Sequence, residues 1–173
     1  KNKQVHDHLV QLTFDFMSGI VRPARAGSKD FHPAVRYNAM LIVGELNSRE
    51  AVKFGEKAPP DPLVGALAVL LEGLVTPGQI DAVRVASLIG ILRHLELDQF
   101  RPNNRRLPDA AKERIFTAVL AIAAANMPPE GRSVAGNHWM RGRAVELLSV
   151  MNLKGTEDKV AVAVENILRD EES

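Results

Sequence analysis

The chain has 173 residues, of which 46% are hydrophobic, 25% charged and 5% aromatic, a composition typical of a soluble globular protein and not of a disordered one. With 22 basic and 21 acidic residues, the net charge of +1 gives no indication of nucleic acid or an anionic membrane as a partner. The absence of cysteine excludes disulfides, thiolate catalysis and cysteine-ligated zinc.

No stretch approaches the ~18 consecutive apolar residues of a membrane span, so no membrane span is expected. The N-terminal segment, residues 1–4, is polar and shows no signal peptide. Because the first residue is not Met, a leader could have been removed. The sequence therefore leaves the localisation open between the cytoplasm and export.

Two helices are predicted in the first 47 residues. The apolar residues of the first recur at steps of three and four over about residues 3–20, as in an amphipathic helix: Val5, Leu9, Leu12, Phe16 and Ile20. The second runs from His32-Pro33 to about Asn47, with proline at a tolerated first-turn position.

The segment from Ser48 to Pro60 is predicted to be a loop, with a short helical turn possible around residues 50–54. Asp61-Pro62 indicates the start of a third helix, because an N-cap acceptor is followed by proline at N1. Thr76-Pro77-Gly78 ends this helix, and a fourth is expected from about Gln79 to Leu97.

Three more helices are predicted in the rest of the chain. Pro108-Asp109 starts the fifth, and Asn137 is expected to cap the sixth, which ends near Leu153 with Gly155 as its C′ residue. Thr156 is expected to cap the last helix, which runs to about residue 169. No stretch alternates with a period of two, so no strand is predicted.

The even-numbered helices share an internal repeat that is anchored on Arg36, Arg84 and Arg141. The residues one before, three after and seven after each arginine are apolar, small and apolar, and their spacing of four places them on one stripe. We expect this stripe to face the core: Val35, Ala39, Val43, Val83, Ser87, Ile91, Met140, Ala144 and Leu148.

The stretch Lys29-Asp30-Phe31-His32-Pro33-Ala34-Val35-Arg36-Tyr37-Asn38-Ala39 resembles the start of the second helix of a HEAT repeat. That family stacks antiparallel A and B helices, and its aspartate and arginine tend to bond along the stack. At the places equivalent to Asp30, this chain has Gly78 and Ala135.

The resemblance implies one all-α domain over residues 1–173, a superhelix of stacked antiparallel helix pairs over about 3–47, 61–97 and 108–153. The segment 156–169 would be a capping helix. An irregular helical bundle with a chance recurrence of Val-Arg is the alternative. We expect Arg36, Arg84 and Arg141 to be structural, each bonding a carboxylate or a helix-end carbonyl, with Asp30 as the acid for Arg36.

Catalytic, metal and cofactor residues are not assigned. His6 and His8 stand two residues apart on a helix and point about 200° apart, so they cannot share one metal ion. Gly-rich phosphate loops, Gly-x-Ser-x-Gly and His-Glu-x-x-His are absent from the sequence.

The basic loop after the fourth helix is the candidate surface for an anion or a partner, because Arg101, Arg105 and Arg106 fall within six residues. We expect a non-enzymatic protein-interaction scaffold that binds a protein or peptide. The alternative is a nucleic-acid binding or processing domain of the HEAT-like DNA glycosylase type, and a third reading is a regulatory domain of a larger protein.

Overall fold

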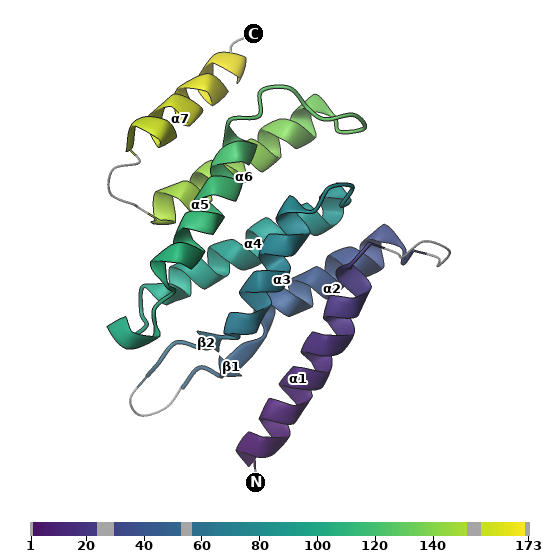
Figure 1. Ribbon diagram of the computed structural model, residues 1–173, viewed down its shortest axis with the longest axis vertical. Coiled ribbons are helices and arrows are strands. Elements are labelled where there is room, and N and C mark those ends of the chain that lie inside the picture. Colours follow the sequence, from purple (N-terminus) through teal and green to yellow (C-terminus); the bar gives the residue numbers. More distant parts are fainter. Residues whose placement is uncertain (1, 24–29, 53–56, 152–156, 172–173) are drawn as a thin grey trace. The chain divides into compact units, whose positions relative to one another are not determined.

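The computed structural model describes residues 2–23, 30–52, 57–151 and 157–171 (Figure 1). In these residues the fold is all-α, as the sequence predicts, with seven α-helices that pack against one another and one two-stranded sheet. The chain divides into two compact units, residues 1–106 and 107–173. None of the described helices is both long and apolar enough for a membrane span.

The first unit contains two pairs of helices. Its elements are α1 (Asn2–Val21), α2 (Pro33–Glu45), β1 (Asn47–Arg49), β2 (Asp61–Pro62), α3 (Val64–Val75), α4 (Asp81–Asp98) and a 3-10 turn, η1 (Asn103–Arg105). Helix α1 packs on α2, α3 packs on α4, and α2 also lies along α4 (Figure 1). The core lies between α2, α3 and α4 and contains fully buried apolar side chains: Met40, Val43, Leu70, Leu88 and Ile91.

Two glycines bring α2 and α4 into backbone contact. A Cβ atom built on Gly44 would lie 2.9 Å from the Cα of Gly90, and a Cβ on Gly90 would lie 2.6 Å from Cδ2 of Leu70. Because protein interiors are close-packed, neither position has room for a methyl group. The close approach of the two helices therefore depends on glycine at both positions.

The short hairpin between the two pairs contradicts three predictions, the first of which is that the chain has no strand. Residues 61–62 form β2, so Asp61-Pro62 does not begin a helix; α3 begins at Val64. Strand β2 pairs antiparallel with β1, and Val52 bridges Ala58 further out, so residues 50–52 are not helical. The reason is that the side chain of Asp61 is bonded to arginines and does not cap the next helix.

Helix α1 agrees with the helix predicted over residues 3–20, but most of its apolar stripe faces solvent. The first four stripe residues are between 53% and 67% exposed: Val5, Leu9, Leu12 and Phe16. Of the five, only Ile20 is buried. The side of α1 that packs on the unit is mixed, with Phe14 near Gly65 and a buried Ser18.

The second unit contains α5 (Asp109–Ala123), α6 (Val134–Met151) and α7 (Glu157–Glu171), and α7 packs on both other helices. Asn137 is not the N-cap of α6, because the helix begins three residues earlier. Ser133 precedes the helix, and its hydroxyl accepts a hydrogen bond of 3.0 Å from the backbone N–H of Gly136, as an N-cap does. Gly155 and Thr156 lie outside the described residues.

The repeat stripe is buried at eight of its nine positions, as predicted. Val35 is the exception, with 45% of its surface exposed, so its prediction is wrong. The equivalent Val83 is covered by Gly73 of α3. A Cβ atom built on this glycine would lie only 3.3 Å from Cγ1 of Val83. Val35 lies in the first turn of α2.

Candidate functional site

A pocket of about 170 Å³ lies in the first unit where the hairpin meets the end of α4. Its walls come from β1, β2, the loop before β2, the last turn of α4 and the turn η1. We call it the hairpin pocket, and its lining residues are Arg49, Ala58, Pro59, Pro60, Asp61, Leu97, Phe100, Arg101, Pro102 and Arg105.

Arg101 forms the inner wall of the hairpin pocket and is only 6% exposed. Its Nε donates to Oδ1 of Asp61 at 2.7 Å, and its Nη2 donates to the backbone carbonyl of Pro62 at 2.8 Å. Oδ1 of Asp98, the last residue of α4, lies 3.6 Å from Nη1 of Arg101. Arg101 therefore does not belong to an exposed anion surface, because it is buried and joins the end of α4 to β2.

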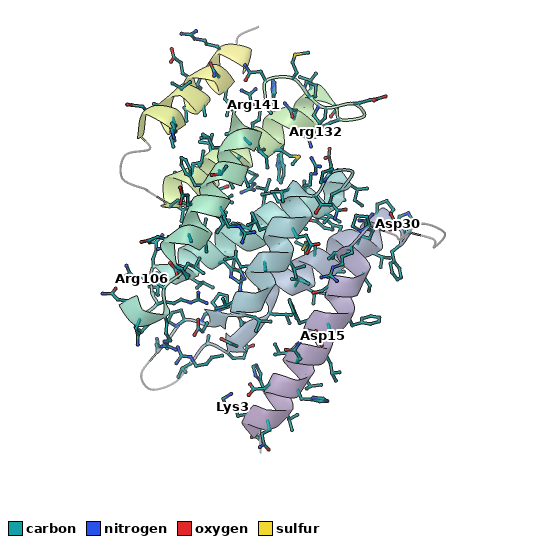
Figure 2. All side chains as sticks on the ribbon, in the orientation of Figure 1. Lys3, Asp15, Asp30, Arg106, Arg132 and Arg141 are labelled. Carbon is teal, nitrogen blue, oxygen red and sulfur yellow. The ribbon has the colours of Figure 1, made fainter. Side chains whose placement is uncertain are left out.

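Arg105 and Arg106 remain at the surface, where Figure 2 shows Arg106 at the edge of the unit. Arg105 reaches Oδ2 of Asp61 at 3.4 Å, and its side chain is 47% exposed, so one face of its guanidinium stays open to solvent. Arg106 donates to the carbonyls of Arg101 and Gln99 beyond the end of α4. These bonds use two of its five N–H donors to cap that helix end.

Arg49 provides a second exposed cation at the mouth of the pocket. Among the described residues, no hydrogen bond or ion pair engages its guanidinium. Phe100 stands at the same mouth and is 69% exposed, which is unusual for a large aromatic side chain. The mouth therefore combines two cations that can bind a ligand with one apolar ring.

The hairpin that carries Arg49 is fixed to the helices by Arg93 of α4. This guanidinium donates to the carbonyl of Gly44 at 3.2 Å and to Oδ1 of Asn47 at 2.7 Å, and its Nε lies 3.1 Å from Glu45. The hydroxyl of Ser48 donates to the carbonyl of Asp61 across the strands. The wall of the pocket is thus held on packed helices.

His94 is fully buried in α4, three residues before Leu97 of the hairpin pocket. Neither of its ring nitrogens has a hydrogen-bond partner among the described residues. Burial lowers its pKa from 6.5 to about 4, with smaller contributions from the charges of Arg93 and Arg101. The imidazole is therefore neutral at neutral pH.

Arg36, Arg84 and Arg141 share one structural role. Each donates to a backbone carbonyl at the end of the preceding helix: Arg36 to Val21 at 3.1 Å, Arg84 to Thr76 at 3.3 Å and Arg141 to Ala123 at 3.1 Å. These carbonyls have no partner within their helix, and a cation also complements the negative end of the helix dipole.

Arg36 also makes the ion pair with Asp30 that the sequence predicts, at 2.7 Å, and donates to the side chain of Gln79. Gln79 in turn donates to the carbonyl of Val21 at 3.1 Å. This bonding joins the first helix pair to the second. Figure 2 labels Asp30 before α2 and Arg141 on α6.

Two other histidines, His6 and His32, have local partners in the described residues. Nε2 of His6 lies 3.6 Å from Glu50, and Nδ1 of His32 accepts from the backbone N–H of Ala34 as the N-cap of α2. In the same residues, no group of three or more possible metal-binding side chains is found.

Sequence reasoning found Arg105 but missed Arg49, Phe100 and the hairpin pocket. The pocket exists because β1 and β2 pair, and two strands of three and two residues leave no periodic signal in a sequence. Pro59-Pro60 was the available signal, since consecutive prolines stay extended and can form an apolar wall.

Comparisons of the chain with protein-family models, with curated proteins and with solved structures gave no match.

Proposed function

We propose that this protein is a non-enzymatic interaction module, built from HEAT-like helix pairs, that binds an acidic segment of a partner protein at the hairpin pocket. The observation that carries the proposal is the exposed Phe100 beside the exposed guanidinium groups of Arg49 and Arg105. Exposed aromatic and arginine side chains are the residue types most enriched at protein interfaces.

The size of the pocket favours a side chain over a free small molecule. Its volume of about 170 Å³ is below the ~300–1,000 Å³ of typical small-molecule sites. A carboxylate from a partner can bind the two guanidinium groups, while a neighbouring apolar side chain contacts Phe100 and the prolines. We therefore expect the bound segment to place Asp or Glu within one or two residues of an apolar side chain.

The HEAT-like assignment is supported by the shared role of Arg36, Arg84 and Arg141 and by the small residues on the inner stripe. Recurrent helix pairs of this kind offer extended surfaces on which partners bind. Nucleic acid is the less supported partner, because the burial of Arg101 leaves few exposed cations at the pocket and nucleic-acid binding depends on the number of phosphates neutralised.

The proposal is tested by selecting short random peptides displayed on phage against the purified protein. Selected sequences are expected to be enriched in Asp or Glu next to an apolar residue. The corresponding synthetic peptides should bind the double variant Arg49→Ala/Arg105→Ala about tenfold more weakly, which corresponds to ~1.4 kcal/mol. Phe100→Ala should weaken binding independently of salt.

Arg22→Ala is the matched control, since Arg22 is an exposed arginine of the same unit, 59% exposed and away from the pocket. It should leave the affinity unchanged. Equal loss in the control, undiminished binding by the double variant, or failure to select acidic peptides would overturn the proposal. Binding of single-stranded or double-stranded DNA that is lost in the double variant would favour the nucleic-acid alternative.

A further inference from the structure

We propose that two copies of this chain associate through α1, with the two helices antiparallel about a twofold axis between Leu9 and Leu12. The basis is the stripe of Val5, Leu9, Leu12 and Phe16, which is at least 53% exposed at every position. Helix α1 packs on α2 (Figure 1), and these four side chains stay exposed although Ile20, further along the stripe, is buried.

The spacing of the stripe is that of a two-helix seam. Its steps of four, three and four residues stay close to the repeat of ~3.5 residues that keeps apolar side chains facing a partner helix. The stripe does not belong to the core of the first unit, because its four side chains are exposed to solvent. A helix is therefore the partner whose shape fits this surface.

The stripe is complementary to itself when the second helix runs in the opposite direction. Leu9 of one copy then lies opposite Leu12 of the other, and Val5 lies opposite Phe16, so the smaller side chain meets the larger one. A twofold axis makes each of these contacts occur twice, as in the isologous interfaces of most soluble homodimers.

The polar residues beside the stripe select the same arrangement. His8 and Asp15 are both exposed and flank the same edge of the stripe. In the antiparallel pairing His8 of each copy lies beside Asp15 of the other, where the imidazole N–H can donate to the carboxylate. In a parallel pairing Asp15 would lie beside Ile20 and have no polar partner from the other copy. Figure 2 labels Asp15 on α1.

The contact is small, so association should be reversible. The four stripe residues offer on the order of 400 Å² per copy, about half of the ~800 Å² that each partner contributes to a standard interface. Sedimentation velocity from roughly 1 to 500 µM brackets the weak association expected of an interface of this size. The wild-type protein should shift from monomer to dimer within this range.

The variant Leu9→Glu/Leu12→Glu should remain monomeric throughout while its circular dichroism stays that of the folded protein, because both side chains are on the solvent side. Val75→Glu is the matched control: Val75 is 54% exposed at the C-terminal end of α3 and does not belong to the stripe, so the variant should dimerise like the wild type.

A charge exchange tests the register. Asp15→Lys should weaken dimerisation by about threefold or more, since each dimer loses two symmetry-related pairs. The double variant His8→Asp/Asp15→Lys should restore it. A wild-type protein that stays monomeric at every concentration, a dimer that survives Leu9→Glu/Leu12→Glu, or a double variant no better than Asp15→Lys would overturn the proposal.

Discussion

Lowering the pH should destabilise the first unit through His94. Its pKa is about 4 in the folded protein and 6.5 as the ordinary value, so the unfolded chain binds the proton more readily. The stability that depends on neutral His94 is therefore fully present above about pH 6.5 and is lost as the pH falls towards about 4. Because a tenfold difference in proton affinity corresponds to ~1.4 kcal/mol, this residue should reduce the free energy of unfolding by about 2 kcal/mol at pH 5 and about 3 kcal/mol at pH 4.

Urea unfolding followed by circular dichroism, at several pH values from 7.5 to 4.5, measures this loss in the wild type and in His94→Leu. Circular dichroism is needed because the single tryptophan, Trp139, lies in α6 of the second unit. The leucine side chain cannot bind a proton and leaves no unpaired ring nitrogen, so the variant should match or exceed the wild type at pH 7.5. Its advantage should then grow by about 2 kcal/mol at pH 5. Parallel pH dependences for the two proteins would refute the reasoning.

Three further outcomes are expected from the packing and the arginine bonds. Gly44→Ala should lower the free energy of unfolding by about 1–3 kcal/mol because its methyl meets the backbone of Gly90, whereas Gly19→Ala, with nothing within 4 Å, should raise it by up to ~1 kcal/mol; equal effects in urea unfolding would contradict this. Arg36→Met should lower the free energy of unfolding by about 2–3 kcal/mol, because its hydrogen bonds are lost. Asp30→Asn should lower it by less than ~1 kcal/mol, because that carboxylate is 47% exposed. Thermal unfolding of the two variants measures both losses, and a larger loss for Asp30→Asn would contradict this order. Ala144→Leu should cost about 1–3 kcal/mol by overfilling a fully buried position of α6, which Trp139 fluorescence during urea unfolding would register; unchanged stability would show that the site can expand.

The helices were predictable because their periodicity extends over several turns, and the inner stripe was predictable because it recurs around three arginines. Val35 and the stripe of α1 show the limit of this reasoning. An apolar period identifies a helix and its apolar side, but not whether another element covers that side. Val35 and Val83 occupy the same repeat position, yet Val83 is buried against Gly73 of α3 whereas Val35 is 45% exposed.

The pocket was less predictable than the fold. Asp61 followed by proline is a good N-cap pattern, but the residue that decides its role is Arg101, forty positions away in the sequence. Local preference for a helix start is worth ~1 kcal/mol, which a buried ion pair with further hydrogen bonds can outweigh. The hairpin that lines the pocket together with Phe100 has only five strand residues, which leave no periodic signal in the sequence.

The glycine contact between α2 and α4 also sets the spacing of the two helix pairs in the first unit. These two helices approach until their backbones touch, whereas α1 and α3 contact each other only marginally. Within residues 1–106, the two helix pairs therefore approach each other most closely along α2 and α4. Larger side chains at positions 44 or 90 would push α2 and α4 apart. Two buried positions can thus alter the spacing of the helices that carry the surface while every surface residue stays the same.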